Sequence, residues 1–149
     1  MPKSRKNTKT TNRTIKNHKS NSKAKIVKSF LEILNAIKLY HWKTESYSQH
    51  KATDELHEKL SENVDQFVEV LLGKEQTKSK YRINMVEKHM KMMDSNNEAD
   101  FIQKIHNYRS ILIDMNKVLD KKKDTDLLSI RDEMLANINQ FLYLLSFDK

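Results

Sequence analysis

A chain of 149 residues is long enough for one domain with a buried core, and its single Gly and single Pro leave little material for tight turns. The absence of Cys excludes disulfides, thiol catalysis and cysteine-ligated zinc or iron–sulfur sites. No apolar run approaches the ~20 residues that span a bilayer and the N-terminus has no hydrophobic signal region, so we expect a soluble protein.

The formal charge of +8 is divided unevenly along the chain. Residues 1–28 contain ten Lys or Arg and no acid, whereas the rest of the chain has 18 bases against 20 acids. The first 25 residues are rich in Lys, Ser, Thr and Asn, and Ile15 is their only large aliphatic residue. Such a segment buries too little surface to offset the entropy of ordering it. We therefore expect residues 1–25 to be a disordered basic tail and residues 26–149 to be the folded domain.

Helical periodicity begins after this tail. A first helix is predicted from about residue 25 to about residue 44, with an apolar face of Val27, Phe30, Leu34, Ile37 and His41. After a polar connection over 44–53, a second helix is predicted from about residue 51 to Leu72, stopping at Gly73, because Gly commonly lies just past a helix C-terminus. Its apolar stripe consists of Leu56, Leu60, Val64, Phe67 and Leu71.

The second half of the chain carries two further helical patterns. Residues 74–97 are expected to form a long link containing a short helix around 82–93. The third helix has apolar positions Phe101, Ile105, Tyr108, Leu112, Met115 and Leu119, and the fourth has Leu127, Ile130, Met134, Ile138, Phe141 and Leu145. Four helices with short first and last connections and a long middle crossover predict an all-α, ferritin-like four-helix bundle.

Four potential metal ligands follow one another on the second predicted helix at offsets of four, eleven and four: His50, Asp54, Asp65 and Glu69. These steps are close to whole turns, so the four side chains share one stripe, and this stripe lies outside the apolar face of the same helix. A ligand stripe that points away from its own core indicates a site shared with a second copy across a two-fold axis.

Three segments carry a resemblance to a known family: YHWKT at 40–44, HKATDELHEKL at 50–60 and VDQFVEV at 64–70. Together they resemble the Dps family of mini-ferritins, and more loosely the short ferritin-like proteins of large DNA viruses. The resemblance implies a homo-oligomer, a dodecamer in the family, that oxidises iron (Fe2+ to Fe3+) with peroxide or oxygen and stores it as mineral. In the implied ferroxidase centre, His41, His50 and Asp54 of one subunit face Asp65 and Glu69 of its two-fold mate, with Trp42 nearby. The interval from His41 to His50 is nine residues, where the family usually has twelve, so the connection between the helices is expected to be shorter.

The proposed ligands also have ordinary structural interpretations. His41 on an apolar face is compatible with a hydrogen-bonded core histidine, and the three carboxylates with a solvated surface. Carboxylates and imidazoles in an open site nevertheless suit Fe(II), whereas thiolates would hold it too tightly. His57 and Glu58, beside the stripe, are expected to be exposed. The methionines at 90, 92 and 93 next to His89 suggest copper, but at helical spacing we favour gap-filling core residues.

The basic tail indicates a polyanionic partner. A flexible cationic arm binds DNA without sequence specificity by displacing counterions from phosphates, and the resembled family often uses basic N-terminal arms in this way. The candidate nucleic-acid-binding residues are Lys3, Arg5, Lys6, Lys9, Arg13, Lys16, Lys19, Lys23 and Lys25. A transit peptide and a nuclear address are alternatives for the tail.

We expect a cytoplasmic or nucleoid-associated protein, or one of the virion or host nucleus if the source is viral. The alternative function is a non-enzymatic, nucleic-acid-binding architectural or packaging protein that keeps the ferritin-like fold without ferroxidase activity.

Overall fold

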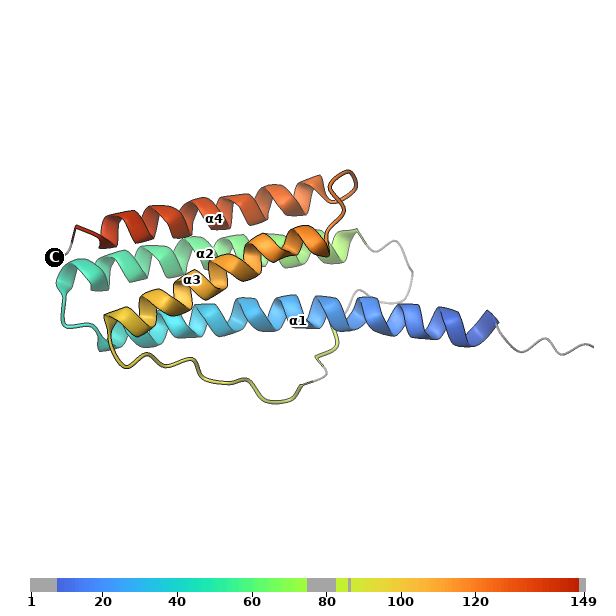
Figure 1. Ribbon diagram of the computed structural model, residues 1–149, viewed down its shortest axis with the longest axis horizontal. Coiled ribbons are helices and arrows are strands. Elements are labelled where there is room, and N and C mark those ends of the chain that lie inside the picture. The colour runs from blue at the N-terminus through green and yellow to red at the C-terminus, as the bar shows by residue number, and fades with distance from the viewer. Residues whose placement is uncertain (1–7, 75–82, 86, 148–149) are drawn as a thin grey trace, which may run out of the picture.

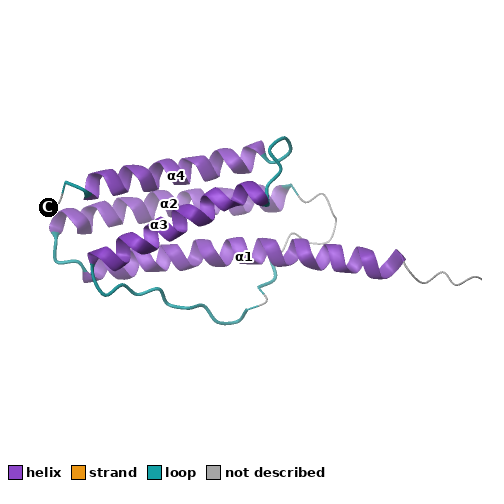
Figure 2. Ribbon diagram, viewed as in Figure 1, coloured by secondary structure: helices purple, strands orange, loops and turns teal. Residues whose placement is uncertain are grey.

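The computed structural model describes residues 8–74, 83–85 and 87–147, with side chains from Ser22 onward. Four α-helices, α1 (Thr8–Lys43), α2 (Tyr47–Gly73), α3 (Glu98–Asp114) and α4 (Thr125–Leu145), are joined by loops, and a short 3₁₀ helix, η1 (Met115–Lys117), follows α3. They pack side by side, and the N-terminal part of α1 extends beyond the other three (Figure 1). The described residues are helix and loop only (Figure 2), which confirms the all-α, four-helix prediction.

Apolar side chains from all four helices form one continuous core. The ring of Phe30 on α1 meets Phe67 on α2 edge-on at 5.1 Å between centroids, and Tyr40 stacks on Phe101 of α3 at 4.0 Å. The apolar stripes predicted for the second, third and fourth helices are buried at every position. Since burying one large apolar side chain contributes about 1.5–3 kcal/mol, these stripes decide which face of each helix turns inward.

The start of α1 differs from the prediction. The helix begins at Thr8 rather than near residue 25, so the expected disorder is not confirmed for residues 8–25, and residues 1–7 lie outside the described part. No Gly or Pro occurs between Thr8 and Lys43. Because a helix that is already nucleated gains a hydrogen bond for each added residue, a segment without breakers can continue it even when it has no apolar face.

Both ends of α2 also differ from the prediction. The connection after α1 comprises only residues 44–46, because the Ser46 hydroxyl accepts a hydrogen bond from the backbone N–H of Gln49 and caps a helix that begins at Tyr47. Gly73 is the last helical residue rather than the first one beyond the helix. Its φ is not positive, and Lys74 forms the C-cap in right-handed conformation. The Gly at this end is therefore not required by backbone geometry.

The long crossover between α2 and α3 runs along α1. No helix occurs at the described residues 83–85 and 87–97, so the short helix predicted around 82–93 is wrong for that part of the link. Residues 87–95, which we call the crossover strap, are tied to α1 at both ends. Lys28 pairs with Glu87, and Lys43 Nζ lies 2.8 Å from Asp94 Oδ1 and 2.7 Å from the Ser95 carbonyl oxygen.

The spacing of these ties explains why the strap is extended. From Lys28 to Lys43 the helix rises about 22 Å, at 1.5 Å per residue. The eight residues from Glu87 to Asp94, together with the side chains that make the ties, must cover that span. Seven steps of extended chain reach about 23 Å, whereas seven steps of helix reach only about 10 Å.

Among the described residues, no helix is both long enough and apolar enough to cross a membrane.

Candidate metal centre

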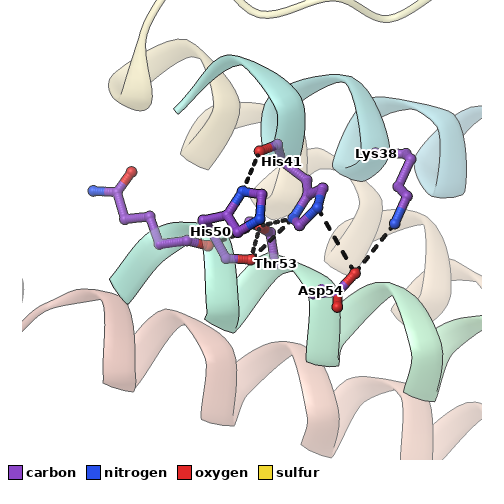
Figure 3. Close-up of polar contacts among 6 residues, drawn as sticks. Lys38, His41, His50, Thr53 and Asp54 are labelled. Atoms are coloured by element: carbon purple, nitrogen blue, oxygen red, sulfur yellow. Dashed lines mark hydrogen bonds and ion pairs between the residues drawn. The ribbon is translucent and has the colours of Figure 1, made fainter. Parts of the chain in front are cut away.

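The short turn after α1 places the last turn of that helix beside the first turn of α2 and brings two imidazoles together. His41 Nδ1 lies 2.9 Å from the carbonyl oxygen of His50, and His50 Nδ1 lies 2.9 Å from the carbonyl oxygen of His41. The rings stack with centroids 3.8 Å apart and planes inclined by 24° (Figure 3). Each histidine thus bonds to the backbone of the other, which ties the two helix ends together.

These reciprocal contacts identify a protonated nitrogen in each ring. A carbonyl oxygen only accepts, so each Nδ1 carries a proton and donates it, and in the neutral form of either ring the lone pair is on Nε2. Thr53 adds to the arrangement, since its hydroxyl oxygen lies 3.2 Å from His41 Nδ1 and 2.7 Å from the Gln49 carbonyl to which it donates. An imidazole whose Nδ1–H is held by a backbone carbonyl is oriented as metal-ligating histidines in proteins are.

Asp54 completes a cluster at the surface. Its Oδ1 lies 3.8 Å from His41 Nε2 and 3.1 Å from Lys38 Nζ, as Figure 3 shows. The hydrogen bond from Lys38, opposed in part by burial, lowers the pKa of the Asp54 carboxyl, and the charges of Lys38 and of the two histidines lower it further. The Asp54 side chain is 58% exposed, so this carboxylate is ionised and accessible at neutral pH.

Asp65 and Glu69 lie elsewhere on the same helix. Both are exposed, as are His50 and Asp54, which confirms that this stripe lies off the core face of α2. Eleven residues separate Asp54 from Asp65, about 16 Å along a helix axis. A single chain therefore brings together His41, His50 and Asp54 and leaves Asp65 and Glu69 apart. Within the described part of a single chain, no group of three or more His, Asp or Glu residues is arranged to hold a metal ion.

The surroundings of Asp65 differ from those of Asp54. Asp65 borders an open groove of about 350 Å³ between α1 and α2, which is also lined by Leu31, Leu34, Glu62 and Val64. Leu31 is 42% exposed. The Asp65 carboxylate thus lies beside partly exposed aliphatic surface.

Trp42, next to His41, is 69% exposed. Two other residues near the cluster were placed wrongly, or not singled out, by the sequence. His57, expected to be exposed, is half-buried. Burial lowers the pKa of His57, and the charges of Lys38 and His41 act in the same direction while Asp54 opposes them. Lys38 was not singled out, although it precedes His41 by three residues, the spacing that puts two side chains on one helix face.

The proposed nucleic-acid-binding residues fall partly within α1. Lys3, Arg5 and Lys6 lie outside the described residues. Basic positions 9, 13, 16, 19 and 23 follow one another at steps of four, three, three and four on the helix, and Lys25 comes two residues later. Steps of three and four keep these five positions on one side of α1.

Comparisons with known proteins give one result. Searches of curated proteins and of solved structures found no significant match. Residues 41–145 match a protein family described as a family of unknown function (DUF5856). The matched range covers more than two thirds of the chain, begins at His41 and includes every candidate metal ligand. The chain therefore belongs to this family of unknown function, DUF5856.

Proposed function

We propose that this chain is the subunit of a Dps-like, ferritin-like homo-oligomer that oxidises and stores iron at a site between subunits and binds DNA through its basic N-terminal region. The observation that carries the proposal is the cluster of His41, His50 and Asp54, in which two imidazoles have their Nδ1 protons fixed by backbone carbonyls beside an ionised carboxylate. Nitrogen and carboxylate ligands of this kind suit a metal that must bind and then leave.

The missing ligands are supplied by a second subunit in this proposal. Asp65 and Glu69 are too far along α2 to complete their own subunit's cluster, but they lie on the same exposed stripe. A two-fold axis pairs each surface patch with its own copy, so each His41–His50–Asp54 cluster would face the partner's carboxylates. The exposed Leu31 beside Asp65 supplies apolar surface for such a contact.

Iron is the substrate of the proposed reaction. Two Fe(II) ions each lose one electron, and one peroxide molecule takes up these two electrons and two protons, breaks its O–O bond and leaves as two water molecules. The protein's part is to bind both ions close to one oxidant and to supply negative charge that stabilises Fe(III). The ionised Asp54, with its lowered pKa, contributes such a charge at neutral pH.

The test replaces Asp54 and Asp65 together by Asn. We expect the double variant to lose Fe(II) oxidation while keeping the helical circular-dichroism signal, because neither side chain lies in the core. The matched control replaces two exposed carboxylates outside the stripe, Glu55→Gln with Glu133→Gln, and should oxidise iron at the wild-type rate. Light scattering should show a closed oligomer for all three proteins. A monomer at micromolar concentration, or full activity in the Asn double variant, would contradict the shared site.

One observation favours the second candidate, an architectural DNA-binding protein without ferroxidase activity. The Lys38 ammonium already forms an ion pair with the Asp54 carboxylate, with Nζ 3.1 Å from Oδ1. Lys38 would have to move when a metal ion binds to that oxygen. Under this alternative the purified wild-type oligomer retards duplex DNA but leaves added Fe(II) unoxidised in the presence of peroxide. The iron-oxidation measurement on the wild-type protein therefore separates the two functions before any variant is made.

A further inference from the structure

Two connected spaces follow the seam between α1 and α3. Near its start α3 packs on α1, where Phe101 stacks on Tyr40 at 4.0 Å, and the two helices diverge toward the C-terminal end of α3 (Figure 1). An inner cavity of about 60 Å³ and an open groove of about 320 Å³, which we call the outer groove, lie along this seam. Ser29 of α1 and Ile111 of α3 border both, so the outer groove leads to the inner cavity.

The inner cavity is lined mainly by apolar surface. Its lining includes Ser29, Ile33 and Ala36 of α1, Met93 of the crossover strap, and Tyr108 and Ile111 of α3. Ser29 and Ala36 are small, and a helix that presents small side chains to its neighbour leaves space that larger ones would fill. Empty cavities in proteins are apolar, and such a cavity can take up a small apolar molecule.

The crossover strap forms one wall of the cavity through Met93. The sequence favoured a role for the methionines at 90, 92 and 93 as gap-filling core residues of a helix. Met93 is half-buried and packs against the core, but Met90 and Met92 are 36% and 58% exposed and the strap is not helical, so this interpretation is wrong for those two. The ion pairs of the strap with α1 keep Met93 in place beside the cavity.

The Tyr108 side chain supplies an unused hydrogen-bond donor to this lining. Its hydroxyl is buried and has no hydrogen-bond partner among the residues that the structure describes. The Ser29 hydroxyl, by contrast, already donates to the carbonyl oxygen of Lys25 at 3.0 Å. A buried water needs about two to four polar partners, so a ligand with one acceptor atom and an apolar remainder suits this cavity better than water does.

The charged side chains of the lining favour an uncharged ligand. Lys104 borders the cavity, and its Nζ lies 2.9 Å from Asp100 Oδ2. Glu32 also borders it, and its Oε1 lies 3.7 Å from Lys28 Nζ. Each of these two side chains thus has a counter-ion within the protein. A charged ligand would be buried without a partner of its own, which is costly, so the polar end of the ligand is expected to be neutral.

The outer groove offers apolar surface to a longer chain. Ile26, Met115 and Val118 contribute to its lining, in addition to Ile111. Ile111 and Val118 are 43% and 58% exposed, so much of this surface is in contact with water. Covering it is favourable by about 25 cal/mol per Å² of apolar surface.

We propose that the seam between α1 and α3 binds a neutral aliphatic molecule with one oxygen acceptor, such as a medium-chain alcohol or ketone. The Tyr108 hydroxyl donates to the oxygen in the inner cavity, and the aliphatic chain lies in the outer groove along Ile111 and Val118. Neither space shares a residue with the His41–His50–Asp54 cluster, so the proposal does not depend on iron oxidation.

The probe is n-octanol, titrated into the full-length protein by isothermal titration calorimetry. We expect saturable binding of one molecule per chain. Tyr108→Phe should weaken this binding about three- to tenfold, the loss expected for one hydrogen bond, and circular dichroism would verify that the variant is folded. Octanoate, which has the same chain length and a charged head, should show no binding, because its charge would be buried without a partner.

Two matched variants test the groove. Ile111→Ser removes apolar wall from both spaces and should weaken octanol binding about tenfold. Ile113→Ser is the control, because Ile113 is 49% exposed on the same helix and borders neither space, and it should bind like the wild-type protein. The proposal is overturned if the wild-type protein shows no saturable binding of octanol, or if octanoate binds as tightly as octanol. It is equally overturned if Tyr108→Phe binds octanol as tightly as the wild-type protein, or if the two Ser variants do not differ.

Discussion

At the scale of single residues, His41 and Tyr108 are two buried polar side chains that differ in their hydrogen bonding. His41 is 6% exposed, and its Nδ1 contacts the carbonyl of His50 and the hydroxyl of Thr53. The Tyr108 hydroxyl is buried without a hydrogen-bond partner, and desolvation alone raises the pKa of this phenol far above its ordinary value. A buried hydroxyl without a partner loses its hydration and gains nothing in return.

Replacing Tyr108 by Phe should therefore leave the free energy of unfolding unchanged or raise it, by up to about 1–3 kcal/mol, the cost of burying an unpaired hydroxyl. The measurement is urea denaturation followed by circular dichroism. Tyr40→Phe is the informative comparison, because the Tyr40 hydroxyl donates to Gln49 Oε1 at 2.6 Å and its removal should destabilise the protein. A clear loss of stability in Tyr108→Phe would mean that an ordered water pairs with this hydroxyl.

Single residues also show how far the sequence could predict the candidate site. Spacing on a helix predicted that His50, Asp54, Asp65 and Glu69 would share an exposed stripe, because helical register depends only on residue number. It could not predict the stacking of His41 on His50, since that contact depends on where Ser46 caps α2 and so on the length of the turn. Lys38 was missed for a related reason: its ion pair with Asp54 joins two different helices.

At the scale of elements, amphipathic helices were the most predictable part of the chain. Every apolar position predicted for the last two helices is buried, because a stripe of large side chains has only one favourable orientation in a bundle. The N-terminal end of α1 and the strap were not predictable in this way. The first has no apolar stripe, and the second is kept extended by ion pairs with α1 that no local pattern encodes.

The C-terminal end of α2 gives an element-scale experiment. Gly73 has right-handed helical geometry, and a Cβ added there would meet no atom within 4 Å. Gly73→Ala should therefore stabilise the protein by about 0.5–1 kcal/mol, because Ala loses less conformational entropy than Gly when it joins a helix. Urea denaturation of the variant measures this gain. A loss of comparable size would show that residue 73 adopts a left-handed conformation instead.

At the scale of the whole molecule, charge and metal ligands lie in different parts of the chain. Deleting residues 1–21 removes seven of the 28 basic residues, and the formal charge falls from +8 to +1, while every candidate metal ligand and every described side chain remains. We expect the truncated protein to lose nearly all affinity for duplex DNA and to oxidise Fe(II) like the full-length protein.

Salt dependence provides the quantitative check on this deletion. An arm that contacts six to ten phosphates loses about 10³ to 10⁵ in affinity between roughly 50 and 200 mM salt, so electrophoretic retardation by the full-length protein should be steeply salt-sensitive. A control that neutralises three exposed bases of the body, Lys121, Lys122 and Lys123 replaced by Gln, should bind DNA nearly as well as wild type. Retardation by the truncated protein at moderate salt would place the DNA-binding surface on the four-helix body.

The unbroken course of α1 has a mechanical consequence for the proposed DNA complex. One helix runs from Thr8 to Lys43 and carries both the basic positions and His41. From Thr8 to Ser22 it rises about 21 Å, the width of a DNA duplex, without a hinge residue. A continuous helix of this kind is stiff, unlike a flexible linker. It would hold bound DNA at a fixed distance and in a fixed direction from the four-helix body of the proposed oligomer. The spacing between the duplex and the oligomer would then be determined by the length of the helix.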